Sequence, residues 1–261
     1  MTAQRRDAPR EWPTGLSSRQ LRLASGLVLL SYISMHLATH TFGLWSLDLA
    51  EHGLAWTKAL WQSWPGTVAL YGAAAAHFAL ALRTIYQRRH WGLPAIEIIR
   101  LWAGFSLPLL LISHVVATRL TLELFGISSD YRRIVGSLIA SGNEGWQIAL
   151  LAPGWLHGCL GLWISLRHVE VMRRLKPALI VFVVALPLLS AGGFGRMTQA
   201  VAAAPPAQSA PLDAAAAAAR RDRLAVWQRG ITTLYLVSLI GAFVGGQIRN
   251  RTERKAGQPV A

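Results

Sequence analysis

Residues 21–47, LRLASGLVLLSYISMHLATHTFGLWSL, form an apolar run with no charged side chain between Arg22 and Asp48. At about 1.5 Å per residue, an α-helix of this length crosses the hydrocarbon core of a bilayer. Two histidines, His36 and His40, lie in the run one helical turn apart and therefore on one face. An ionisable side chain at membrane depth is costly and usually faces the interior of a helix bundle, so this stretch is a candidate functional site.

The composition is that of an integral membrane protein. Of 261 residues, 53% are hydrophobic and 15% are charged, and several apolar stretches approach or exceed about 18 residues. The net charge of +14 does not indicate nucleic-acid binding, because the basic residues lie at the ends of apolar runs and form no stripe along which a phosphate backbone could lie. The one cysteine, Cys159, excludes an intramolecular disulfide, a Cys-ligated iron–sulfur cluster and a Cys-rich zinc site within this chain.

The apolar runs predict an all-α integral membrane bundle of six transmembrane helices. If the N-terminus is inside, 17 of the 26 Lys and Arg residues fall on the inner side, so both termini are predicted to be cytoplasmic. The predicted spans are 21–47, 67–82, 98–118, 146–166, 177–194 and 230–248. The predicted divisions are an N-terminal arm (1–20), helices one to five (21–195), an extracytoplasmic Ala/Pro-rich loop whose second half is a short surface helix (196–227), helix six (228–248) and a basic cytoplasmic tail (249–261).

Each of the first four spans carries a histidine in its apolar part. In addition to His36 and His40, these are His77, His114 and His157, while the other three histidines lie in predicted loops or at helix ends. A single membrane histidine is more often a hydrogen-bonded structural residue than a ligand. Four consecutive helices that each carry one favour a ligand set.

The depths of these histidines divide them into two levels. Counted from the basic residue at the cytoplasmic end of each span, His77 lies about 9 Å and His157 about 15 Å deep, whereas His36 and His114 lie about 21 Å and His40 about 27 Å deep. An inner pair from spans two and four and an outer pair from spans one and three suit axial ligation of two hemes, one towards each membrane face. A zinc ion would instead require three or four ligands at one depth.

The surroundings of the histidines are compatible with a large flat cofactor. Small residues around His77 and His157 leave room for a porphyrin, although they equally allow close helix packing. Arg119, which follows His114 near the outer face, either pairs with a heme carboxylate or simply extends to the interface. Because no C-x-x-C-H motif occurs, the hemes would be non-covalent and of b type. Two imidazoles saturate the iron, which favours electron transfer.

Four histidine-bearing blocks, in this order, carry a family resemblance. The chain resembles the six-helix, diheme-b membrane anchor at the N-terminus of a group of bacterial class III adenylate cyclases, which is similar to the cytochrome b subunits of succinate dehydrogenase and fumarate reductase. The resemblance extends over residues 15–195, and 196–227 match only as a variable loop. The blocks are SMHLATHTFGLWSL, PGTVALYGAAAAHFALALRTIYQRR, LPLLLISHVVATRLTLELFG and WLHGCLGLWISLR.

The resemblance implies a redox-sensing module in the bacterial cytoplasmic membrane. Two hemes would equilibrate with the membrane quinone pool, and their redox state would alter a cytoplasmic cyclase. His77, His114 and His157 would be heme ligands together with His40, or with His36 as the alternative. His40 gives the larger vertical separation between the hemes, and His36 gives the better depth match to His114.

The chain departs from this family after its sixth helix. In the family a ferredoxin-like domain and the catalytic domain follow, whereas this chain stops at Ala261, and no cyclase metal-binding carboxylates can be assigned in it. We therefore expect a regulatory anchor that is not itself an enzyme, either alone or with its output domain on another polypeptide. A homodimer is expected because class III cyclases need two catalytic domains. The alternatives are a cytochrome b anchor subunit of a respiratory quinone oxidoreductase and a heme-free transporter whose histidines relay protons.

Overall fold

The computed structural model describes residues 17–204 and 214–256, and all of its regular elements are helices. Six of the described helices are long and apolar enough to cross a membrane, which confirms the predicted fold. Most of the predicted N-terminal arm, the centre of the predicted loop and the last residues of the tail lie outside the described residues. The elements are α1 (Ser18–Thr41), the 3₁₀ turn η1 (Phe42–Leu44), α2 (Leu47–Trp61), α3 (Trp64–Gln87), α4 (Ala95–Val115), the π-helical segment η2 (Val116–Leu120), α5 (Thr121–Phe125), α6 (Tyr131–Ser141), α7 (Glu144–Leu166), α8 (Glu170–Arg174), α9 (Lys176–Ala203) and α10 (Ala214–Lys255).

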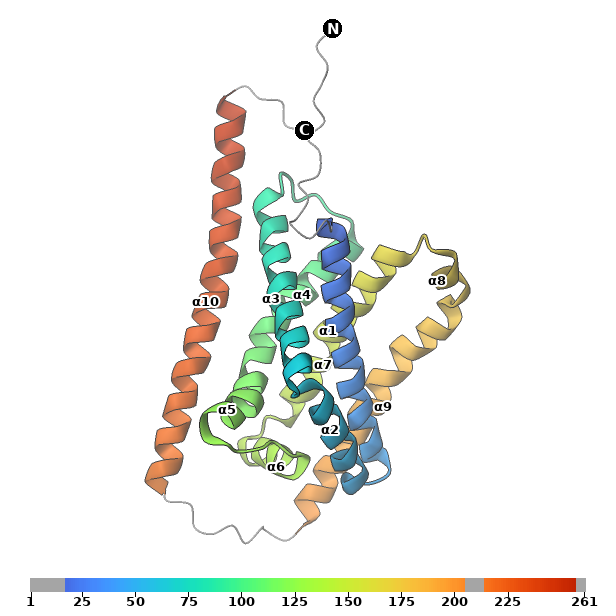
Figure 1. Ribbon diagram of the computed structural model, residues 1–261, viewed down its shortest axis with the longest axis vertical. Coiled ribbons are helices and arrows are strands. Elements are labelled where there is room, and N and C mark those ends of the chain that lie inside the picture. Colours follow the sequence, from blue (N-terminus) through green and yellow to red (C-terminus); the bar gives the residue numbers. More distant parts are fainter. Residues whose placement is uncertain (1–16, 205–213, 257–261) are drawn as a thin grey trace.

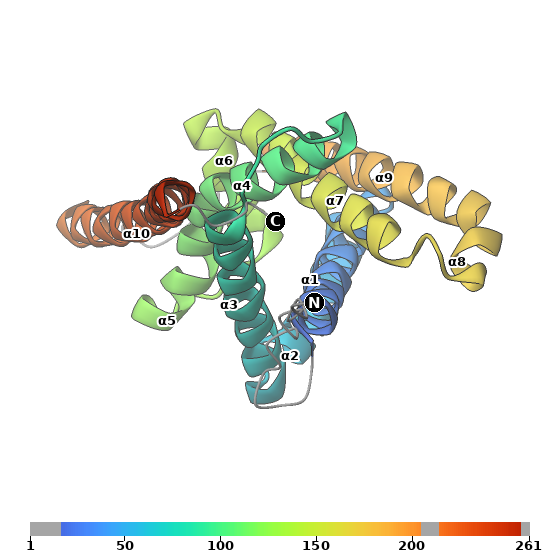
Figure 2. The same ribbon diagram turned by 90° about the horizontal axis from the view of Figure 1, so that it is seen from above.

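The spanning helices surround a common centre. Figure 2 shows α1, α3, α4 and α7 around this centre, with α10 on one side and α8 and α9 on the other. Helix α1 begins and α10 ends at the same end of the molecule, where α8 and the link between α3 and α4 also lie (Figure 1). We call this the inner end, and its location in the cytoplasm stays a prediction.

Local capping sets where several helices begin and end. The Ser17 side chain accepts a hydrogen bond from the backbone of Gln20, and Gln20 reaches back to the Ser17 backbone, which forms a capping box at the start of α1. Asp130 accepts from the backbone N–H of Arg133 and so begins α6. Helices α5 and α6 are each followed by a glycine in the left-handed region, a conformation that side chains with a Cβ disfavour.

Two connections at the outer end, which the hydropathy pattern leaves as loops, are helical. Helix α2 joins the first two spans, and α6 lies between the third and fourth. Their apolar faces meet in one cluster, in which Tyr131 and Val135 of α6 pack with Ala50 of α2 and with Phe194 and Met197 of α9. This cluster covers the outer end of the bundle.

The sixth span belongs to a much longer helix than predicted. Helix α9 continues to Ala203, and α10 runs unbroken over 42 residues from Ala214 to Lys255. Only a short part of 196–227 therefore lies outside these two helices. The alanine run at the start of α10 favours the longer helix, because alanine has the strongest helix propensity of all residue types. A helix of 42 residues is about 63 Å long, twice the thickness of a hydrocarbon core of about 30 Å.

Helices α1 and α9 come into very close contact near the outer end. A Cβ added at Gly193 would overlap the carbonyl oxygen of His40, and one at Gly43 would lie 2.6 Å from the carbonyl oxygen of Gly193. Glycine at both positions lets the two backbones touch, as small residues do in membrane helix pairs. This contact fixes the part of α1 that carries His40.

We expect Gly193→Ala to destabilise the protein, because its methyl group would force α9 away from α1 at a cost of about 1–3 kcal/mol. Gly195→Ala is the matched control, since a Cβ there meets nothing within 4 Å and alanine improves helix propensity by up to about 1 kcal/mol. Thermal unfolding in detergent would measure both. Equal midpoints for the two variants would contradict the close crossing.

Candidate cofactor site

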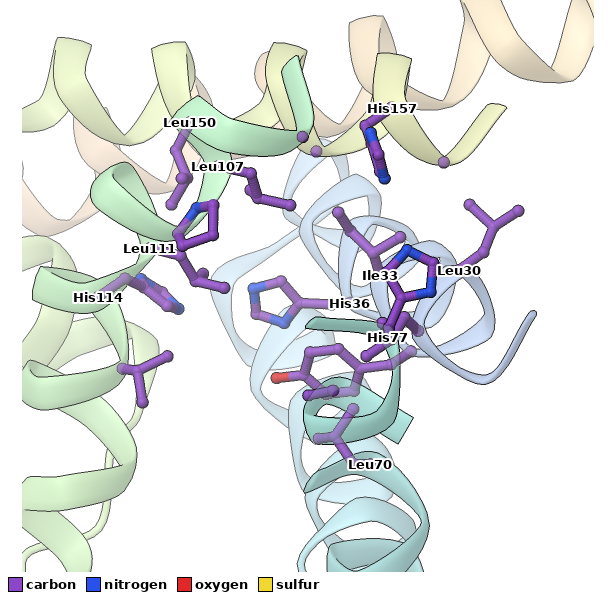
Figure 3. A pocket seen from close by; sticks show the side chains of 18 of the residues that line it. Leu30, Ile33, His36, Leu70, His77, Leu107, Leu111, His114, Leu150 and His157 are labelled. Atoms are coloured by element: carbon purple, nitrogen blue, oxygen red, sulfur yellow. The ribbon is translucent and has the colours of Figure 1, made fainter. Parts of the chain in front are cut away.

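A cavity of about 1430 Å³ lies at the centre of the bundle, with α1, α3, α4 and α7 as its main walls. It exceeds the range of about 300–1,000 Å³ that is typical of a single ligand pocket. The five histidines predicted as ligand candidates all line it. Figure 3 shows four of them, His36, His77, His114 and His157, directed towards the cavity from different helices, with leucine and isoleucine side chains between them.

The inner pair consists of His77 on α3 and His157 on α7. Their ring centroids are 6.0 Å apart and their planes are nearly perpendicular, at 88°. Two imidazole nitrogens on opposite sides of one metal ion lie about 4 Å apart and their ring centroids about 6 Å apart, given metal–nitrogen bonds of about 2 Å. The pair thus has the spacing of two axial ligands.

Each inner histidine already uses its Nδ1 atom. The Nδ1–H of His157 donates to the backbone carbonyl of Arg100 at 2.9 Å. The Ser25 hydroxyl donates to the carbonyl of Arg22, so its oxygen is left to accept from the Nδ1–H of His77 at 3.1 Å. Metal-bound histidines almost always donate their second N–H in this way. Both rings therefore keep the Nε2 lone pair available as a ligand.

The two inner rings lie against the backbone of neighbouring helices. A Cβ added at Gly104 of α4 would lie 2.6 Å from Cε1 and Nδ1 of His157, and one at Gly26 of α1 would lie 3.5 Å from Cε1 of His77. Gly104 is therefore a position where any side chain would displace the imidazole. Neither glycine lies in the blocks of small residues that the sequence pattern emphasises.

The small residues around His157 serve more than one purpose. A Cβ at Gly154 would lie 3.0 Å from Ile33, and one at Gly158 would lie 2.8 Å from Leu30, so these glycines permit packing against α1. Gly161 also lines the cavity, and a Cβ there would meet nothing within 4 Å. Close helix packing thus accounts for two of these glycines.

The outer group contains three histidines. His36 on α1 lies 5.9 Å from His114 on α4, with the rings at 68°, which is nearly the separation of the inner pair. His40 lies one turn beyond His36, with 3.3 Å between the two Nε2 atoms. Its ring packs against Tyr131 and Phe194, and its Nδ1 is buried and has no hydrogen-bond partner among the residues that the structure describes. By ring separation, His36 is the partner of His114.

A hydrogen-bonded chain from α6 supports the backbone at His36. The Thr39 hydroxyl donates to the carbonyl of His36 at 2.7 Å, so its oxygen accepts from the Tyr131 hydroxyl at 2.8 Å. Burial raises the pKa of Tyr131 well above its usual value, so the phenol stays protonated and can donate at neutral pH. Helix α6 thereby contacts the outer histidines through a polar group as well as through its apolar face.

Arg119 lies in η2, directly beyond His114. The Thr118 hydroxyl donates to the carbonyl of His114 at 2.7 Å, and the Arg119 guanidinium forms an ion pair of 2.8 Å with Glu123. Arg119 also lines the cavity. A π-helical turn inside an α-helix is frequent at functional sites, and here it directs a cation to the outer part of the cavity wall.

Two arginines at the inner rim were not predicted as site residues. Arg22 and Arg100 line the cavity, and neither forms an ion pair with a carboxylate among the described residues. Within the described part of the chain, the Nε of Arg100 is buried without a partner, and the Arg22 side chain donates to the Thr84 hydroxyl at 2.8 Å. In the sequence, each of these arginines marks the inner end of a span. The same position places a positive charge at the depth where the edge of a bound cofactor would lie.

The donor set suits a planar cofactor better than a bare metal ion. Within residues 17–204 and 214–256, no group of three or more His, Cys, Asp or Glu side chains could hold a metal ion. Two opposed pairs of imidazoles instead fit a metal whose remaining ligands come from a macrocycle. No protein-family model matches the chain, and no curated protein or solved structure shows significant similarity to it.

We expect Gly104→Ala to displace the His157 ring and to break its hydrogen bond to the Arg100 carbonyl, because the new methyl group would occupy the position of the ring edge. NMR of protein with isotope-labelled histidine nitrogens would show a changed Nδ1 signal for His157. Gly72→Ala is the control, since a Cβ at this α3 position meets nothing within 4 Å. Unchanged His157 signals in the Gly104 variant would contradict this geometry.

Proposed function

We propose that the chain is a diheme b-type membrane redox sensor, which exchanges electrons with quinone and governs a cytoplasmic adenylate cyclase domain that is not in this sequence. The observation that carries the proposal is the pair of bis-imidazole arrangements, with ring separations of 6.0 Å and 5.9 Å, formed by alternating spans. The quinone and the cyclase rest on the family that the histidine blocks resemble.

The ligand assignment follows from ring separation and tautomer. His77 and His157 would hold the inner heme, with both Nδ1 atoms engaged by protein acceptors. His36 and His114 would hold the outer heme, since their separation matches that of the inner pair. His40 would then support His36 without being a ligand itself, and its ring would pack against Tyr131.

The protein residues orient the ligands and exclude water. Each heme would be held by one histidine pair and would supply one-electron transfer when bound. The Arg100 carbonyl and the Ser25 hydroxyl fix the tautomer and direction of the inner imidazoles. Arg22 and Arg100 place two positive charges at the inner rim, where they would bind the carboxylates that every b-type heme carries.

Helix α10 provides the link to a cytoplasmic partner. At the inner end the Asn250 amide donates to the carbonyl of Arg88 at 3.0 Å, and Glu253 forms an ion pair of 3.2 Å with Arg89. These contacts join α10 to the end of α3, the helix that carries His77. A change in the position of α3 would therefore move the segment from which the chain leaves the bundle.

Reduced-minus-oxidised visible spectra with heme quantitation test the cofactor assignment. We expect about two b-type hemes per chain in the wild type, because each pair of imidazoles forms one axial site. His77→Ala should lose the inner heme and His114→Ala the outer one, each leaving one heme with its own reduction potential. Wild-type protein without heme after heme-replete expression, or loss of the same heme in both variants, would overturn the proposal.

Matched single variants distinguish the two histidines of α1. We expect His36→Ala to lose the outer heme and His40→Ala to retain it with a shifted potential, because the His36 ring lies opposite His114. Heme stoichiometry and the low-temperature spectrum of the outer component would measure this. Retention in the His36 variant together with loss in the His40 variant would assign the ligand to His40.

A further inference from the structure

Helix α10 contributes a buried tyrosine to the wall of the cavity. Tyr235 is only 6% exposed, whereas the other aromatic residues of α10, Trp227 and Phe243, are exposed by 46% and 44%. Its ring packs in a cluster with Ile112 and Val116 of α4 and η2. The sixth span therefore reaches the cofactor site although it carries no histidine.

Two further contacts of Tyr235 are with residues next to the inner histidine pair or its support. Its hydroxyl donates to the backbone carbonyl of Phe105 at 2.7 Å, and its ring lies 5.6 Å from that of Phe78. Phe105 directly follows Gly104, against which the His157 ring lies, and Phe78 directly follows His77. Tyr235 thus contacts both the residue that follows Gly104 and the residue that follows His77.

The backbone of α4 is locally weakened where Tyr235 binds. Pro108 lies inside α4 and has no N–H, so the carbonyl of Gly104 lacks its usual partner four residues later. A helix can bend at such a position. The hydrogen bond from Tyr235 to the next carbonyl therefore helps to set the direction of the α4 segment that carries both Gly104 and Arg100.

The structure assigns the Tyr235 hydroxyl as a positioning group that couples α10 to the inner histidine pair. The path runs from the hydroxyl through Phe105 and Gly104 to the His157 ring of that pair. The path does not include the outer pair, because the ring of Tyr235, not its hydroxyl, packs against Ile112 and Val116 on either side of His114. Since coupling free energies are reciprocal, a change at the inner pair would also alter the packing of α10.

A second contact carries this coupling to the inner end. Gly246 of α10 lies against the backbone of Tyr86 on α3, where a Cβ would be 2.6 Å from the Tyr86 carbonyl oxygen. The Arg249 guanidinium lies over the Tyr86 ring, 4.9 Å from its centroid. Helix α10 therefore packs against α3 both at the level of His77 and at the inner end of α3. The inner pair and the end of α10 thus belong to one packed unit.

The test is Tyr235→Phe, which removes the hydroxyl and retains the ring packing. Ser238→Ala is the matched control, because it removes a hydroxyl from the same helix that bonds only to Leu234 within α10. This inference uses the proposed hemes as its main readout, and the inner component is identified as the one lost in His77→Ala. Redox titration should show a shifted midpoint for the inner heme in Tyr235→Phe, an unshifted outer heme, and neither shift in Ser238→Ala.

The outcomes separate this inference from the proposed function. Two hemes in the wild type with no shift in Tyr235→Phe, or with equal shifts of both hemes, would overturn the coupling and leave the diheme proposal intact. If the wild type holds no heme, the diheme proposal fails and the coupling is measured by histidine nitrogen NMR. There, Tyr235→Phe should move the signal of His157 and leave that of His114 in place, and an unchanged His157 signal would overturn it.

Discussion

The central constraint in this molecule is that an imidazole inside a membrane has two ring nitrogens and no water to satisfy them. An unsatisfied polar group at that depth costs several kcal/mol. For the inner pair, the bundle meets this constraint between helices: α4 supplies the Arg100 carbonyl to His157 of α7, and α1 supplies Ser25 to His77 of α3. The helix pairs α4 with α7 and α1 with α3 also make extensive backbone contact. Because the Nδ1 atoms of His77 and His157 bind to neighbouring helices, their Nε2 atoms are directed into the cavity.

The two ends of the cavity have different surroundings. Arg22 and Arg100 line the cavity beside the inner pair. Tyr235 of α10 reaches this pair indirectly, through its hydrogen bond to the Phe105 carbonyl. The outer group is covered by α6, where Tyr131 supports the α1 backbone through Thr39. Positive charge and the end of a long helix thus border the inner end of the cavity. An apolar cluster lies over the outer end.

Hydropathy and counting along a helix predict the six spans and the division of the histidines into levels, since both depend only on rise per residue. The ring contacts of His77 with His157 and of His36 with His114 agree with that division, while heme ligation by them stays a prediction. Gly104 and Tyr235 could not be found in this way, because their importance depends on which side chain of another helix lies opposite. Helices α2 and α6 were missed because their amphipathic faces have partners only in the folded bundle.

The hydrogen bonds of the inner pair favour the proposed role as ligands over a proton relay. A relay needs ring nitrogens that alternate between donor and acceptor with partners that can release a proton. A backbone carbonyl only accepts, so the bond to Arg100 holds the Nδ1–H of His157 in one tautomer, and the Ser25 hydroxyl is already committed to the carbonyl of Arg22. His36 and His40, with their Nε2 atoms 3.3 Å apart, could exchange a proton. Such an exchange would stay within the outer group, because the Nδ1 atoms of the inner pair are held by the Arg100 carbonyl and the Ser25 hydroxyl, and this agrees with the proposed electron transfer better than with proton transport.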